Sequence, residues 1–146
     1  RDKVFVLSPL ERTSAEALEL GRSLVRSIGA RVLIMDPQRH DRLVAAISHL
    51  PYLLAVTLVN TAEEVSRDDP LVWRLAASGF RDTSRVAAGD ITMMLDILAT
   101  NRGHVLEMLS RAQGHLSTLM RYLAEEDLGG LRAALHAART RRADMF

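Results

Sequence analysis

One long apolar segment sets the strongest constraint on how this chain can fold. It reads LVAAISHLPYLLAVTLV and runs from Leu43 to Val59. A helix that is apolar on every side must be covered on every side. The segment is slightly short for a membrane span, and it contains proline and histidine, so a buried core helix is the better interpretation. We therefore predict a core helix that needs several neighbours, and no membrane partner.

Polar residues interrupt this segment at Ser48-His-Leu-Pro-Tyr52. Proline inside a helix frees the carbonyl four residues back, here that of Ile47, and predicts a kink. On a helical wheel Asp41, Ser48 and Tyr52 fall within about 40° of each other, with His49 about 80° further round. Two interpretations stay open. The polar side chains either satisfy the freed carbonyl or line a binding site.

The N-terminal residues 1–36 have the pattern strand, helix, strand. The strands read KVFVLSP and ARVLIMDP, and Gly29 ends the helix between them. This pattern predicts a β-α-β unit with parallel strands and a right-handed crossover. Two parallel strands do not make a stable sheet alone. We therefore interpret residues 1–36 as the end of a larger Rossmann-type nucleotide-binding domain, and the start at Arg1 without methionine as a sign of a longer protein.

Residues 37–146 are predicted to form an all-helical domain, which makes the fold class mainly α. The first helix runs from Asp36 to about Ser66, and a very long one follows Asp90. At about 36 residues, the latter would extend about 54 Å, which exceeds the width of a small domain. Leu128-Gly-Gly then interrupts it, and a last helix follows over residues 131–142. These lengths predict a homodimer with interleaved helices.

A second polar cluster lies in SGFRDTSRVAAGD, residues 78–90. Arg81 and Arg85 are four residues apart and share a face if the segment is helical. A guanidinium group can form two parallel hydrogen bonds with one carboxylate. Two guanidinium groups at a helix junction therefore indicate an anion site. The alternative is that both arginines form structural ion pairs, for example Arg85 with Asp41.

Composition excludes several other functions. The formal charge of +1, from 19 basic and 18 acidic residues, gives no general attraction to nucleic acid, and the arginines lack the interleaved aromatics of a nucleic-acid surface. The absence of cysteine suits a cytoplasmic protein. The histidines lack ligand spacing, so no metal site is predicted. No glycine-rich phosphate loop is found.

Two long motifs resemble the C-terminal part of the prephenate/arogenate dehydrogenase family. They read HDRLVAAISHLPYLLAVTLV and ASGFRDTSRVAAGDITMMLDILATNR. The family shows H-D-R, then [ST]-H-L-P-H, then G-F-[KR]-D-x-[ST]-R, then D-P-x-M-W-x-D-I-x-x-x-N. The resemblance covers nearly the whole chain. It implies an NAD(P)-dependent oxidative decarboxylation in tyrosine biosynthesis and a helical dimerisation domain like that of 6-phosphogluconate dehydrogenase.

The resemblance also implies roles for particular residues. Arg85 would clamp the ring carboxylate of prephenate or arogenate, and Arg81 would assist at the other end of the substrate. Ser48 and His49 would line the pocket. Tyr52 and Met94 stand where the family has histidine and tryptophan, which bears on the choice between the two substrates. Asp41 would be a resting ionic partner of Arg85.

The family's cofactor loop and catalytic histidine would lie before this chain. We therefore predict that these 146 residues alone bind no NAD or NADP, contain no catalytic residue and have no dehydrogenase activity. Two alternatives stay open. One is a helical dimerisation module that binds no small molecule. The other is the C-terminal domain of a different 6-phosphogluconate or β-hydroxyacid dehydrogenase.

Overall fold

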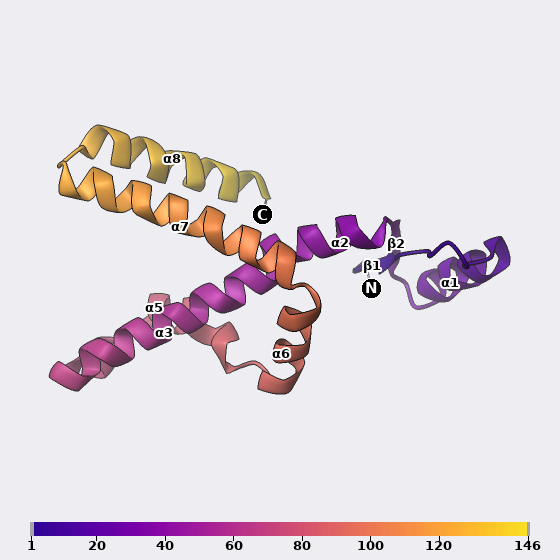
Figure 1. Ribbon diagram of the computed structural model, residues 1–146, viewed down its shortest axis with the longest axis horizontal. Helices are drawn as coiled ribbons and strands as arrows, with labels where there is room; N and C mark the ends of the chain where they lie inside the picture. The colour runs from indigo at the N-terminus through magenta and orange to yellow at the C-terminus, as the bar shows by residue number, and fades with distance from the viewer. Residues whose placement is uncertain (1, 146) are drawn as a thin grey trace. The chain divides into compact units, whose positions relative to one another are not determined.

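The computed structural model describes residues 2–145 and divides the chain into two compact units, Arg1–Val105 and Leu106–Phe146. The model is mainly helical, with one small sheet near its N-terminal end (Figure 1). The mainly α fold class predicted from the sequence is confirmed. The expected division after residue 36 falls inside the first unit and stays a prediction.

The first unit begins with the predicted β-α-β element. Strands β1 (Val4–Leu7) and β2 (Arg31–Ile34) pair in parallel, with Val4 opposite Arg31, and helix α1 (Ala15–Ser27) connects them. Ser14 caps α1 by accepting a hydrogen bond from the amide of Ala17 at 3.2 Å. In β1, Val4 and Phe5 are about half exposed, and the two residues that follow are only partly buried. A two-stranded sheet with open faces depends on further strands or another cover.

A continuous helical rod follows over residues 37–68. It consists of α2 (Pro37–Val44), the π-helical turn η1 (Ala45–His49) and α3 (Leu50–Asp68). Asp36 caps its start by accepting from the amide of Arg39 at 3.0 Å. By length and composition the rod could cross a membrane, with a mean hydropathy of 1.7 in its most apolar window, of which 17% is buried. Long core helices share these properties.

The proline in the rod is accommodated by a widened turn rather than by the simple kink that we predicted. The amide of Leu50 donates to the carbonyl of Ala45, five residues back, instead of four. In a regular α-helix the Pro51 ring would crowd the carbonyl of Ile47, four residues earlier, and the wider turn relieves this contact. A π turn contains more residues than an α turn. The angles between side chains that we predicted from Asp41 to Tyr52 for an ideal α-helix therefore do not hold across this turn.

Three short helical segments and a longer helix follow α3. They are α4 (Leu71–Leu75), α5 (Ser78–Ser84), the 3₁₀ turn η2 (Arg85–Ala88) and α6 (Ile91–Thr100). The first three pack against α3. Trp73 and Phe80 meet edge to face with their ring centroids 5.9 Å apart. Asp90 caps α6 by accepting from the amide of Met93 at 2.7 Å.

The very long helix predicted after Asp90 is wrong, because the chain breaks it at Asn101. Helix α6 ends at Thr100, and α7 (Arg102–Ala124) begins after Asn101. The backbone of Asn101 has φ −107° and ψ 24°, outside the helical range. Its side-chain amide bonds to another helix instead of facing solvent. The apolar spacing continued through this residue, so the periodicity alone concealed the break.

The second unit contains the rest of α7, a tight turn and α8 (Leu128–Met145), and we call residues 106–145 the C-terminal helix pair. Glu126 at the turn has φ 54°. The carboxylate of Asp127 accepts from the amide of Gly130 at 2.8 Å. The predicted interruption at Leu128-Gly-Gly is therefore wrong. These residues form the first turn of α8, and the acidic residues before them make the turn and the cap.

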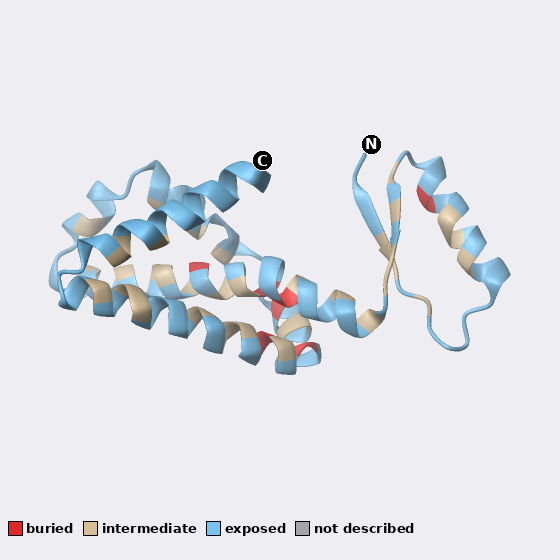
Figure 2. Ribbon diagram, turned by 90° about the horizontal axis from the view of Figure 1, so that it is seen from above, coloured by how far each residue is buried: buried red, intermediate tan, exposed pale blue. Residues whose placement is uncertain are grey.

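Few of the described residues are fully buried, as the mostly pale blue ribbon in Figure 2 shows. The buried apolar residues are spread over α1, the rod, α6 and α7: Val25, Ala45, Ala55, Met94 and Val105. Ile47, in the middle of the apolar segment, is 74% exposed. The described residues thus cover only part of the helix that we expected to be surrounded. The rest of its surface needs another cover.

Candidate functional site

A pocket of about 430 Å³ lies beside the widened turn of the rod. It brings together residues from η1, α3, η2 and the start of α6. They are Ser48, Tyr52, Arg85, Val86, Ala88, Gly89, Met93 and Met94. Four of these residues were predicted from the sequence as substrate-binding: Ser48, Tyr52, Arg85 and Met94.

Two polar groups reach the pocket from the rod. Ser48 belongs to the π turn, and Tyr52 lies in the first turn of α3, on the other side of Pro51. Neither side chain makes a hydrogen bond to any other residue within 2–145. Both hydroxyl groups can donate and accept, so each is available to a bound molecule.

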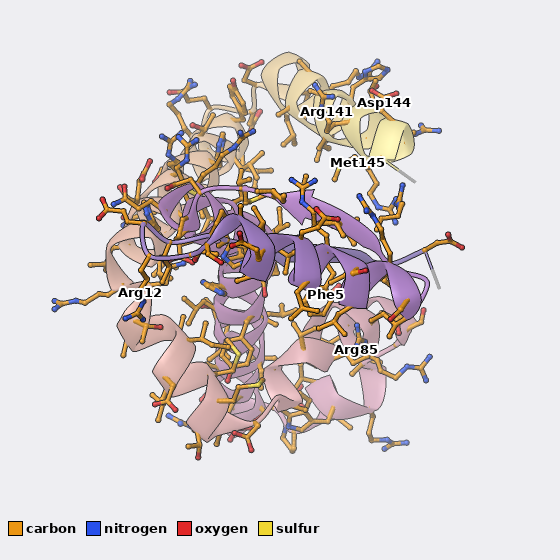
Figure 3. The ribbon with its side chains drawn as sticks, turned by 90° about the vertical axis from the view of Figure 1, so that its right-hand side faces the viewer. Phe5, Arg12, Arg85, Arg141, Asp144 and Met145 are labelled. Atoms are coloured by element: carbon orange, nitrogen blue, oxygen red, sulfur yellow. The ribbon has the colours of Figure 1, made fainter. Side chains whose placement is uncertain are left out.

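Arg85 supplies the positive charge of the pocket. It is the first residue of the 3₁₀ turn η2, directly after α5, and its side chain is labelled in Figure 3. Among residues 2–145 its guanidinium has no ion pair and no hydrogen bond. An arginine without a protein carboxylate, in a pocket with two free hydroxyls, is suited to a planar anion such as a carboxylate.

The opposite wall of the pocket is apolar. Met94 is buried, whereas Met93 is about half exposed, and the Asp90 cap fixes the helical turn that contains both. At Gly89 a Cβ would lie 3.6 Å from the Tyr52 ring and 3.4 Å from the carbonyl of Val86. Backbone and ring therefore approach closely there. The pocket can hold an acidic molecule that also has an apolar ring or chain.

His49 follows Ser48 in the chain, but it is buried and is not among the residues that line the pocket. It is 7% exposed, and its Nδ1 lies 3.3 Å from Nδ2 of Asn101. Burial lowers the pKa of His49, Asp41 acts to raise it and His40 to lower it. The neutral imidazole is thus the favoured form. We had predicted that His49 lines the pocket, whereas here it supports the turn that carries Ser48.

Arg81 and Asp41 also lie outside this pocket. The Arg81 side chain is 80% exposed, with its Nε 3.7 Å from Asp82. The change from α-helix to 3₁₀ turn at Arg85 separates the two arginines that we expected to share one face. Asp41 contacts Nδ1 of His40 at 3.0 Å, so the Asp41–Arg85 ion pair that we expected is replaced by this neighbouring contact.

Asn101 is the residue of this region that the sequence analysis did not identify. It is 8% exposed, and its Nδ2 donates to the backbone carbonyl of Asp41 at 2.7 Å. The available signal was an asparagine, a poor helix former, inside a long apolar repeat.

The described residues do not fit a metal or a dinucleotide. Within residues 2–145 no group of three His, Asp or Glu side chains is placed to hold a metal ion. The connection from β1 to α1 contains no glycine, and Ser14 already occupies an amide at the start of α1. A dinucleotide pyrophosphate needs a glycine-rich turn and free amides at such a position.

Comparison with known proteins gives a consistent family. The family described as prephenate dehydrogenase, dimerization domain, matches residues 36–137. Prephenate dehydrogenase of Bacillus subtilis (strain 168) is 32% identical over 127 residues, which cover 87% of this chain and 34% of that protein.

Solved structures agree with this result. Synechocystis arogenate dehydrogenase matches with a TM-score of 0.86 at 30% identity, covering 98% of this chain and 52% of that one. Prephenate dehydrogenase from A. aeolicus, in complex with hydroxyphenyl propionate and NAD+, matches with a TM-score of 0.89 at 27% identity, covering 98% and 50%. This chain thus spans between about a third and about half of the length of these relatives.

Proposed function

Because this chain belongs to the prephenate dehydrogenase family, we propose that it is the substrate-binding and dimer-forming part of a prephenate or arogenate dehydrogenase. The complete enzyme would carry out an NAD(P)-dependent oxidative decarboxylation in tyrosine biosynthesis in the cytoplasm. The present chain alone would be inactive, since residues 2–145 provide no site that fits the dinucleotide. Its task would be to bind and orient the acidic cyclohexadiene.

The observation that carries this proposal is Arg85, which has no ion pair among residues 2–145 and lines the pocket beside Ser48 and Tyr52. The guanidinium would hold the ring carboxylate, and the two hydroxyls would bond to its oxygens or to the ring hydroxyl. Met94 and Met93 would contact the ring itself. Arg81 keeps its proposed role at the other end of the substrate, although its contact in this chain is with Asp82.

Dimer formation is the second part of the proposal. The matched family is a dimerization domain, and many large apolar side chains of this chain are exposed, including Ile47 in the rod and Leu116 in α7. A soluble monomer rarely exposes so many large apolar side chains. A second copy that covers them would account for the exposed rod, and no membrane partner is proposed.

The exposed apolar surface also favours a second candidate, a helical assembly module that binds no small molecule. Ligand binding separates the two candidates. A ligand at a hundred times its Kd stabilises the folded state by about 2.7 kcal/mol, whereas a pure assembly module gains nothing. The match to the prephenate dehydrogenase family disfavours the other 6-phosphogluconate-type dehydrogenases.

The experiment is thermal unfolding and calorimetric titration with hydroxyphenyl propionate, the ligand found in the A. aeolicus protein. We expect the ligand to raise the Tm of the wild-type chain. Arg85→Ala should weaken binding by roughly a hundredfold, because an arginine–carboxylate contact is lost. Arg74→Ala, which removes an exposed arginine of α4, is the matched control and should bind normally. Normal affinity in Arg85→Ala would refute the proposed role of Arg85.

A further inference from the structure

Asn101 connects two parts of the protein that both contribute to the pocket. It lies between α6 and α7, and α6 carries Met93 and Met94 on the pocket wall. Its amide nitrogen reaches the rod at two points, the carbonyl of Asp41 at 2.7 Å and Nδ1 of His49 at 3.3 Å. These two points lie before and at the end of the widened turn that carries Ser48.

The chemistry of the partners fixes the orientation of this amide. A backbone carbonyl only accepts hydrogen bonds, so the NH₂ group of Asn101, and not its oxygen, must face Asp41. The second hydrogen of that NH₂ group is then directed to His49, whose Nδ1 must accept. A histidine that accepts at Nδ1 is neutral and carries its proton on Nε2.

We propose that Asn101 is a positioning residue for the anion pocket, holding His49 in the neutral Nε2–H tautomer and thereby fixing the turn that presents Ser48. This inference rests on the proposed function, because it assigns Asn101 a part in binding the same carboxylate ligand. Asn101 itself does not line the pocket. It acts by holding α6 and the π turn in a fixed relation, so that Ser48 and Met94 face the same ligand.

The first test compares Asn101→Ala with Asn60→Ala in the full chain, using hydroxyphenyl propionate as the probe. Asn60 is an exposed residue of α3 and provides the matched control. We expect Asn101→Ala to bind about tenfold more weakly with its helix content unchanged, since one buried and one partly buried hydrogen bond are lost. The control should bind like wild type. Wild-type affinity in Asn101→Ala would overturn the inference.

The second test does not depend on whether that variant folds. ¹⁵N chemical shifts of His49 in the wild-type chain should show a protonated Nε2 and a bare Nδ1. The opposite tautomer would overturn the inference. Asn101→Asp should raise the pKa of His49, because a carboxylate beside Nδ1 favours the imidazolium, and an unchanged pKa would also overturn it.

These outcomes are distinct from a failure of the proposed function. If the wild-type chain does not bind hydroxyphenyl propionate, the proposed function fails for this chain, and the tautomer of His49 still decides whether Asn101 holds the turn. If Arg85→Ala loses binding while Asn101→Ala keeps it, the function stands and the role of Asn101 is refuted.

Discussion

The widened turn and the C-terminal helix pair differ in how their side chains are buried and bonded. At the turn, His49 and Asn101 are buried polar residues that bond to each other and to the backbone. In the C-terminal helix pair no residue of α8 is fully buried, and several large apolar residues of the pair are exposed, among them Leu116, Leu123 and Leu135. The turn is completed by this chain itself, whereas the helix pair leaves apolar surface uncovered among residues 2–145.

This difference indicates which region has a strictly defined geometry and which does not. A buried polar pair costs stability unless both members are satisfied, so it defines one local geometry. Exposed apolar faces tolerate many packings and gain stability from area alone. A substrate pocket beside the widened turn would use its defined geometry, and a dimer interface on the helix pair would use its apolar area.

The largest effect is expected from charging the exposed stripe on α7. Leu116 and Leu123 are both about 60% exposed and lie two turns apart. If a second copy covers them, the double variant Leu116→Glu/Leu123→Glu should weaken dimerisation by roughly a hundredfold or more, as for central interface residues. Sedimentation equilibrium measures the dimer constant.

A control with the same change in charge is available on the same helix. Arg111→Gln/Arg121→Gln removes two positive charges and two exposed ion pairs, with Glu107 and Glu125. Exposed ion pairs contribute little, so dimerisation should persist. A wild-type dimer constant in the leucine variant would place the interface elsewhere.

Within the helix pair, Gly130 is the position least able to accept a side chain. A Cβ there would lie 2.6 Å from the ring of Tyr122 and even closer to the carboxylate of Asp127. Gly130→Val should therefore lower the free energy of unfolding by about 1–3 kcal/mol, as overpacking does. Urea unfolding at constant protein concentration measures the change.

Gly114 in α7 gives the comparison, because nothing lies within 4 Å of its Cβ position. Gly114→Ala should raise stability by up to about 1 kcal/mol through helix propensity. Equal effects of the two substitutions would contradict the close packing at Tyr122.

The smallest effect is expected at the turn, and it depends on pH. Burial, the largest cause, lowers the pKa of His49 in the folded state below its value in the unfolded chain. The unfolded state therefore binds more protons once the pH falls below about 6.5, and the free energy of unfolding should fall there. One such group contributes a slope of at most about 1.4 kcal/mol per pH unit.

His49→Gln should remove this part of the pH dependence, and His115→Gln, at an exposed position of α7, should leave it unchanged. Urea unfolding between pH 5 and pH 8 tests both variants. A pH profile of His49→Gln identical to wild type would indicate that the pKa of His49 is the same in the folded and the unfolded state, and would contradict the expected effect of its burial.

The sequence predicted the elements whose signals are local. The capping residues Asp36 and Asp90, and the two short strands with the helix between them, follow from residue type and spacing, and the structure agrees with each. The residues at the pocket were identified through the family motifs. Arg85, Ser48, Tyr52 and Met94 do line one pocket, and whether they bind substrate stays a proposal.

The errors come from contacts that periodicity does not encode. The break at Asn101 depends on a hydrogen bond to Asp41, 60 residues earlier. The direction of His49 depends on the extra residue in the π turn, which rotates the helical wheel away from its ideal phase. Arg81 was placed with Arg85 because an ideal α-helix was assumed, whereas the chain tightens into a 3₁₀ turn at Arg85.

The π turn at Ala45–His49 can be regarded as one surplus amino acid accommodated in an otherwise ordinary helix. Deleting a residue such as Ala46 would restore regular winding and turn α3 by about 100° relative to α2, the angle of one residue in an α-helix. Ser48 and His49 could then no longer serve the pocket and Asn101 at the same time. Changes of length in this segment should therefore be tolerated far less than changes among its aliphatic side chains.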